Sequence, residues 1–168
     1  MHRIAGRRDV RAAAIAVIVV IVMLASTAAL SAAFASQSTT SGGVTRTALA
    51  ETAPANAPGQ ELYLQEVRID PGAKLPTHFH EGTQVASIRA GVLTYDIVSG
   101  STTVTRADGK VETITGPTTI TLRKGDALVE TTSLVHFGSN KGKKEVVVLL
   151  AALLAQGAPL ATPVNGVQ

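Results

Sequence analysis

Three histidines in two distant parts of the chain have the residue types and the spacing of a metal site. One residue separates His78 from His80, and His136 follows more than fifty residues later. Because alternate side chains of a β-strand share a face, His78 and His80 are expected to point the same way and can bind one ion together. Gln84 has the same parity unless the intervening turn changes the phase. His136 could close the site from another strand.

Glycines frame these histidines in two blocks, with residues 92–124 between them. The first block contains Gly72, His78, His80, Gln84 and Gly91, and the second contains Gly125, His136 and Asn140. The spacing resembles the two motifs of the cupin superfamily, G-x5-H-x-H-x3,4-E-x6-G and G-x5-P-x-G-x2-H-x3-N. Gln84 stands at the Glu of the first motif, and Thr131 and Ser133 stand at the Pro and the second Gly of the second motif. The resemblance covers about residues 44–163.

The resemblance implies an all-β chain folded as a small jelly-roll barrel, with one divalent metal held inside it. Carried over to this sequence, the metal ligands are His78, His80, Gln84 and His136. Imidazole with an oxygen donor suits Fe, Mn, Ni, Cu or Zn, and the sequence does not choose among them. Glu81 is an alternative carboxylate, although its place beside His80 predicts that it faces outward.

Glutamine in place of glutamate changes the charge expected at the site. An amide oxygen is neutral, so three histidines and Gln84 leave a divalent ion with its full positive charge. We therefore expect weaker metal binding, a bound iron or manganese that is harder to oxidise, and stronger attraction of an anionic substrate. Gln84 also cannot act as a general base.

Other residues near the blocks have simpler interpretations. Three buried histidines satisfied by hydrogen bonds are the alternative to a metal site, but hydrogen bonding does not require these spacings. Tyr95 is interpreted as a core or rim residue in preference to a pocket acid or a substrate contact. Asp126 and Asn140 are interpreted as structural residues of turns.

The first 35 residues have the order of a targeting segment. Four arginines precede 24 residues without charge, and Ala33-Phe34-Ala35 fits a cleavage site before Ser36. The uncharged stretch, residues 12–35, is also long enough to cross a bilayer. A cleaved signal peptide and an uncleaved membrane anchor therefore both stay open. Either one predicts an extracytoplasmic location, secreted or anchored to the membrane.

Composition excludes several classes of function. The chain has no cysteine, which excludes disulfides, cysteine-ligated zinc, iron–sulfur clusters and cysteine nucleophiles. The net charge of +3 is carried by the first 35 residues, and the charges balance from Ser36 onward. The remaining chain therefore has no basic excess with which to bind nucleic acid.

The chain is divided by composition into four parts. Residues 1–35 are the targeting segment, residues 36–60 a flexible linker rich in Ser, Thr, Ala and Pro with a possible edge strand over 44–49, residues 61–158 the barrel, and residues 159–168 a tail. Within the barrel, short β-rich runs alternate with turn residues every 8–12 positions, as in an all-β sandwich or barrel. We expect strands at 61–69, 83–90, 92–99, 111–115, 118–123, 127–130 and 133–138. The run 145–154 also has helical composition, although Val146 to Val148 favour a strand at its start.

Three functions stay open at the level of sequence. The first is a metal-dependent enzyme acting on a small oxygenated or anionic substrate, and the second is a non-catalytic cupin that binds a metal or a small ligand. The third is a barrel used only for assembly, against which the intact ligand positions count. The family resemblance also implies a homodimer. Because one fold hosts many activities, the resemblance does not decide between catalysis and binding.

Overall fold

The computed structural model describes residues 37–164 and 166 and contains only β-strands as regular elements. The strands are β1 (Ser38–Ser41), β2 (Val44–Thr52), β3 (Gln60–Ile69), β4 (His78–Phe79), β5 (Thr83–Ala90), β6 (Val92–Ser99), β7 (Ser101–Thr105), β8 (Val111–Thr115), β9 (Thr118–Arg123), β10 (Ala127–Glu130), β11 (Val135–Ser139), β12 (Val146–Ala155) and β13 (Thr162–Pro163). Over this part of the chain no helix is long and apolar enough to cross a membrane. The predicted targeting segment, residues 1–35, lies outside the described residues.

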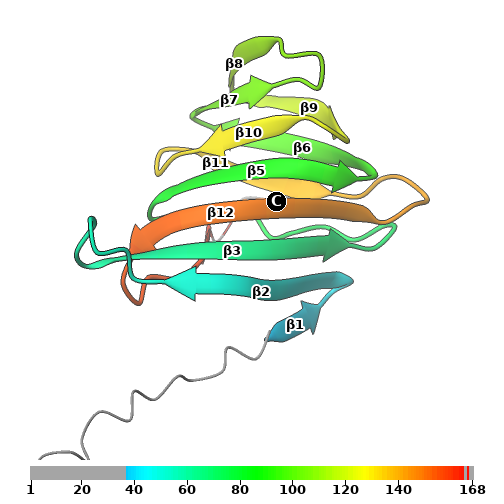
Figure 1. Ribbon diagram of the computed structural model, residues 1–168. Helices are drawn as coiled ribbons and strands as arrows, with labels where there is room; N and C mark the ends of the chain where they lie inside the picture. The colour runs from blue at the N-terminus through cyan, green and yellow to red at the C-terminus, as the bar shows by residue number, and fades with distance from the viewer. Residues whose placement is uncertain (1–36, 165, 167–168) are drawn as a thin grey trace, which may run out of the picture. The chain divides into compact units, whose positions relative to one another are not determined.

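The strands form two antiparallel sheets that face each other. One sheet has the order β1-β2-β3-β12-β5-β10-β7-β8, and the other has the order β13-β4-β11-β6-β9. Figure 1 shows β2, β3, β12, β5 and β10 stacked in front, with β6, β9 and β11 behind them. Most neighbours within a sheet are far apart in sequence, which is the arrangement of a jelly roll.

Alternation of apolar and polar side chains determines which face of each strand is buried. On β5, Ala86 and Ile88 are buried while Val85 is exposed, and on β6 Leu93 and Ile97 are buried. Successive side chains of a strand point to opposite faces, so these alternating residues from both sheets meet in one core. The core has few aromatic side chains and consists mainly of Val, Ile, Leu and Ala.

The predicted strands of the barrel are present, and the flanking segments are more ordered than the composition indicates. Residues 38–41 and 44–52 form β1 and β2 where most of residues 36–60 is expected to be a linker, and β2 pairs with β3 along nearly its whole length. The run near Val146 is a strand to Ala155 and has no helical portion. The predicted tail contains β13, which pairs with β4.

The glycines of the two motifs occupy backbone conformations that other residues rarely adopt. Gly72, Gly91 and Gly125 have φ angles of 83°, 76° and 94°. An added Cβ at Gly72 meets nothing within 4 Å, whereas at Gly91 it would collide with the backbone carbonyl of Glu145. Glycine is therefore required at position 91 by both its positive φ and the nearby backbone, and at position 72 by its positive φ alone.

Substitution of these two glycines is expected to separate the two effects. Gly72→Ala should lower the free energy of unfolding by about 1–2 kcal/mol, the cost of a left-handed L-residue. Gly91→Ala should lower it by about a further 1–3 kcal/mol, because the neighbouring backbone has to move. Urea denaturation of the two variants beside the parent chain measures both values. Equal losses in the two variants would contradict the role given to the contact with Glu145.

Candidate metal centre

The three predicted histidines converge inside the barrel. His78 on β4 and His136 on β11 lie directly opposite each other in the antiparallel ladder, and His80 follows β4 with the same parity as His78. Their ring centroids are 4.4–5.1 Å apart, and at most 7% of each residue is exposed. One nitrogen from each ring lies within 4.8 Å of the others. The predicted convergence of two distant segments is therefore present.

Backbone carbonyls fix the orientation of two of these rings. Nδ1 of His78 donates to the carbonyl of Pro76 at 2.7 Å, and Nδ1 of His80 donates to the carbonyl of Leu160 at 2.6 Å. At these distances the proton has to lie on Nδ1, so Nε2 of each ring keeps its lone pair. A histidine whose outer nitrogen is held by a carbonyl in this way is the usual form of a metal ligand.

A carboxylate that no motif position predicts lies against two of the three histidines. Oε2 of Glu130 lies 3.2 Å from Nε2 of His80, and Oε1 lies 3.2 Å from Nε2 of His136. With bonds of about 2.1 Å, two ligands of one ion at angles of about 90–110° are about 3.0–3.4 Å apart. The observed separations therefore match neighbouring ligands of a single metal ion.

Solved structures of known proteins share this architecture. An oxalate oxidase in complex with the substrate analogue glycolate superposes with a TM-score of 0.50 and 22% identity, covering 75% of this chain and 57% of that one. A variant of oxalate decarboxylase from B. subtilis superposes with a TM-score of 0.54 and 17% identity, covering 77% of this chain and 30% of that one. This chain has the cupin fold. It spans little more than half of the oxalate oxidase chain and under a third of the decarboxylase chain. No protein-family model matches the sequence, and no curated protein sequence matches it.

Gln84, at the position of the cupin glutamate, lies beside a histidine and makes contacts of a different kind. Its Nε2 is 2.9 Å from the carbonyl of Leu160 and 2.9 Å from Nδ1 of His80. The contact is therefore on the Nδ1 side of the His80 ring, whereas Glu130 faces Nε2. Ligation by Gln84 stays a prediction, and the geometry favours a role in holding the carbonyl of Leu160, which in turn orients His80.

The cross-strand register explains how Glu130 reaches the cupin site. Glu130 on β10 and Gln84 on β5 are directly opposite each other in the sheet. Side chains at opposed positions share a face and are about 4.5–5.5 Å apart at Cβ. A carboxylate at 130 can thus reach the space that one at 84 would occupy. Glu81, the alternative carboxylate, is exposed, and its Oε1 accepts a hydrogen bond from Thr162.

Glu130 is ionised at neutral pH although it is buried. Burial alone would raise its pKa, but His136 and His80, with the Tyr95 hydroxyl, lower the pKa to about 2. Burial, followed by the neighbouring His136, lowers the pKa of His78 to about 4, and burial also lowers the pKa of His136. At neutral pH His78 and His136 are therefore neutral and Glu130 is a carboxylate, the protonation states that metal binding requires.

Tyr95 is a core residue, as the sequence indicates, and it also contacts the site. Its hydroxyl donates to Oε1 of Glu130 at 2.7 Å, and its ring stacks on His136 with a centroid distance of 5.0 Å. Burial and the nearby Glu130 raise the pKa of Tyr95 well above its usual value, so the hydroxyl remains a donor. Asn140 and Asp126 are structural, as predicted, since each bonds the backbone of neighbouring turns.

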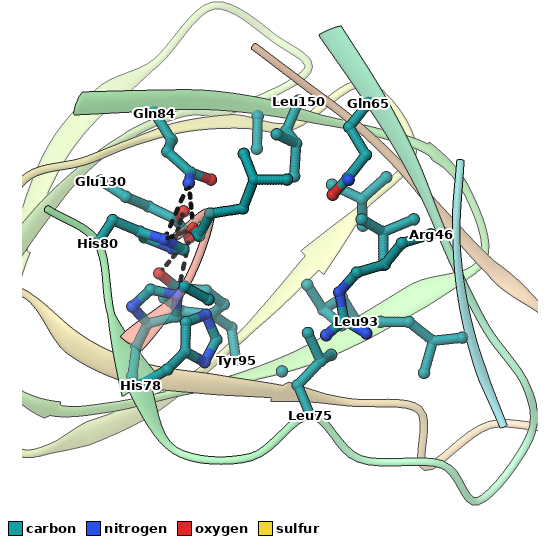
Figure 2. A pocket seen from close by; sticks show the side chains of 18 residues that line it. Arg46, Gln65, Leu75, His78, His80, Gln84, Leu93, Tyr95, Glu130 and Leu150 are labelled. Carbon is teal, nitrogen blue, oxygen red and sulfur yellow. Dashed lines mark hydrogen bonds and ion pairs between the residues drawn. The ribbon is translucent and has the colours of Figure 1, made fainter. Parts of the chain in front are cut away.

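A cavity of about 80 Å³ adjoins the metal centre. His78, His80 and Glu130 lie at one end of it, and Arg46 and Gln65 lie at the other (Figure 2). Leu75, Leu93 and Leu150 form part of the wall between. The cupin barrel therefore offers room for a small molecule beside the centre.

Proposed function

We propose that this chain is an exported cupin that holds one divalent transition metal, Fe, Mn, Ni, Cu or Zn, and binds a small anionic molecule beside it. The metal ligands in this proposal are His78, His80, His136 and Glu130. Export rests on the sequence of residues 1–35. Attachment to a membrane by residues 12–35 and a homodimer stay predictions from the sequence.

The observation that carries the proposal is a buried imidazole nitrogen without a hydrogen-bond partner, next to a buried carboxylate. Nε2 of His80, which points toward Glu130, is buried and has no hydrogen-bond partner among the described residues. The lone pair of His80 also faces the ionised Glu130. Such a cluster is unfavourable by itself, because buried polar groups and charges require partners. A divalent cation between Nε2 of His80, Nε2 of His136 and Glu130 would satisfy the His80 nitrogen and the carboxylate together.

Glu130 also changes the charge expected at the site. Three neutral histidines and one carboxylate leave a divalent ion with one excess positive charge, not two. Reasoning from Gln84 alone predicted the larger excess and weak binding. With Glu130 as a ligand, the proposed site has the three histidines and one carboxylate of the two cupin motifs, with the carboxylate on a different strand.

Each residue has a defined task in the proposed site. A bound metal would supply Lewis-acid or one-electron chemistry to an oxygen-bearing ligand. Pro76 and Leu160 hold His78 and His80 in the ligating tautomer through their carbonyls. Tyr95 fixes one oxygen of Glu130. The surrounding leucines exclude water, which strengthens the interaction between the ion and an anion.

A binding protein without catalytic activity is the second candidate function. One observation favours it: the Tyr95 hydroxyl, which could serve as an acid, already donates a hydrogen bond to Glu130. General acid–base catalysis needs a group within reach of the substrate and free to transfer its proton. Small carboxylates bound without turnover by the metal-loaded protein would support this second function.

The metal is tested by elemental analysis of the purified protein beside His80→Ala. The parent chain is expected to carry up to one first-row metal ion per chain. The variant should lose most of it, since removing one ligand of four typically reduces affinity by more than the 10–100-fold seen for outer partners. Glu81→Ala is the matched control, because Glu81 is exposed, and it should keep its metal. Equal metal content in the parent chain and His80→Ala would defeat the proposal.

A further inference from the structure

Arg46 places an unneutralised positive charge in the cavity. It lies on the inward-facing row of β2 with Val44, and it is half-buried. Burial lowers its pKa, and no acidic residue contributes to that shift. Other arginines on the barrel are paired: Arg68 contacts Glu66 at 2.8 Å, and Arg106 contacts Glu112 at 2.6 Å. Within the described part of the chain, Arg46 has neither an ion pair nor a side-chain hydrogen bond.

Gln65 places a second unpartnered polar group beside it. Gln65 is only 7% exposed and shares the inner face of β3 with Val67 and Ile69, which are both apolar. Its position is diagonal to that of Arg46, because Arg46 lies opposite Val67 in the ladder between β2 and β3. None of the described residues hydrogen-bonds the Gln65 amide. Because Gln65 lines the cavity, its amide is available to hydrogen-bond a ligand there.

Both groups point into the same space from the side opposite the metal centre. Figure 2 shows the guanidinium of Arg46 and the amide of Gln65 directed into the cavity, with His78 and His80 across from them. Leu75, Leu93 and Leu150 lie along the walls between. The cavity therefore has two polar ends separated by apolar walls.

We propose that Arg46 and Gln65 form an anion-binding subsite that holds the carboxylate of the ligand, while the far end of the same ligand reaches the metal centre. A guanidinium presents a planar pair of N–H donors that matches the two oxygens of a carboxylate. The amide of Gln65 can donate a further hydrogen bond. The ligand class is a carboxylic acid with an apolar body and an oxygen donor at its other end. This inference rests on the proposed function for the role of the metal, but not for the role of Arg46.

Charge balance supports an anion at this place. Glu130 is the acidic residue that lines the cavity among the described residues, and it lies at the metal end against His80 and His136. Glu130 therefore does not neutralise the charge of Arg46. With a divalent ion held by Glu130, both ends of the cavity carry excess positive charge. A bound carboxylate would neutralise the end at Arg46, where burial leaves little water to do so.

The test uses a matched series of probes with the full-length protein. Straight-chain ω-hydroxy carboxylic acids of three to eight carbons, and the corresponding amides, are titrated calorimetrically into metal-loaded protein and into metal-free protein. We expect binding of acids of one preferred length and at least 10-fold weaker binding of the matching amides. Arg46→Met should weaken binding of the preferred acid at least 10-fold, and Gln65→Leu should weaken it less. Arg46→Lys, which keeps the charge, should retain part of the affinity.

The control is Arg68→Met, which removes a charge from the exposed outer face of the neighbouring strand and should leave acid binding unchanged. Binding that is equal in the parent chain and Arg46→Met, or equal for acids and amides, would overturn the subsite. Metal content and thermal unfolding of each variant are measured alongside. A parent chain that takes up no metal, yet binds acids through Arg46, would overturn the metal centre and keep the subsite. A parent chain that binds metal but no acid would overturn the subsite and keep the metal centre.

Discussion

Glu130→Gln is expected to lower the affinity for a divalent transition metal at least 100-fold. The substitution keeps the shape of the side chain but removes the negative charge that lies 3.2 Å from the His80 and His136 nitrogens. A lost ligand charge should exceed the 10–100-fold effect of an outer partner. Competition with a chromogenic chelator measures the change. Metal binding like that of the parent chain would show that Glu130 is not a ligand and would favour Gln84 in that role.

The double variant Gln84→Glu with Glu130→Gln is the sharper comparison. It moves the carboxylate across one strand pair, from β10 back to the position of the first cupin motif on β5, and leaves the total charge unchanged. We expect it to recover at least 10-fold of the affinity lost in Glu130→Gln, because the two positions are opposed on one face. No recovery would mean that the carboxylate functions only on β10, together with the hydrogen bond from Tyr95.

Much of the barrel could be predicted because its signals are local. Short β-rich runs bounded by turn residues, such as Thr83–Ala90 and Val92–Ser99, indicate strands from a few residues. The glycine and histidine blocks identify the two segments of the site. Gly91 shows why such spacing is readable: its positive φ and the contact with Glu145 tolerate no side chain.

The carboxylate of the site could not be predicted, because its position depends on a pairing between distant strands. Residues 91–126 separate β5 from β10 along the chain, and no turn between adjacent strands fixes their register. Glu130 therefore cannot be placed opposite Gln84 by counting. A weaker signal was present: Glu130 shares its parity with the buried Leu128, so an acidic residue is expected on the inner face of that strand.

The segments on either side of the predicted barrel are more ordered than their composition indicates. Residues 38–52 are rich in Ser, Thr and Ala, so composition indicates a linker with a possible edge strand over 44–49, yet β2 runs from Val44 to Thr52, pairs with β3 and places Val44 in the core. The predicted tail acts through a backbone atom, the carbonyl of Leu160, which accepts from His80 and Gln84. Since every residue has a backbone carbonyl, no pattern of side chains in the sequence predicts this contact.

Acidification is expected to destabilise the metal-free protein in two separate ranges of pH. The pKa of His78 is about 4 in the folded chain and about 6.5 in the unfolded chain. Between these values the unfolded chain takes up a proton that the folded chain does not, so stability falls as the pH falls from about 6.5 to 4. A difference of this size corresponds to about 3 kcal/mol in the free energy of unfolding. The buried His136, whose pKa is also lowered, acts in the same direction.

Glu130 acts in a lower range for the opposite electrostatic reason. Its pKa is lowered to about 2 in the folded chain, so the stability that it contributes is present above its unfolded pKa of about 4.3 and is lost as the pH falls toward 2. Urea denaturation of chelator-treated protein from pH 7 to pH 3 measures both ranges. His78→Gln should flatten the upper range and leave the lower one, and Glu130→Gln should do the reverse. Constant stability of the parent chain between pH 6.5 and 4.5 would contradict a neutral, buried His78 and hence a site whose imidazoles are ready to bind a metal.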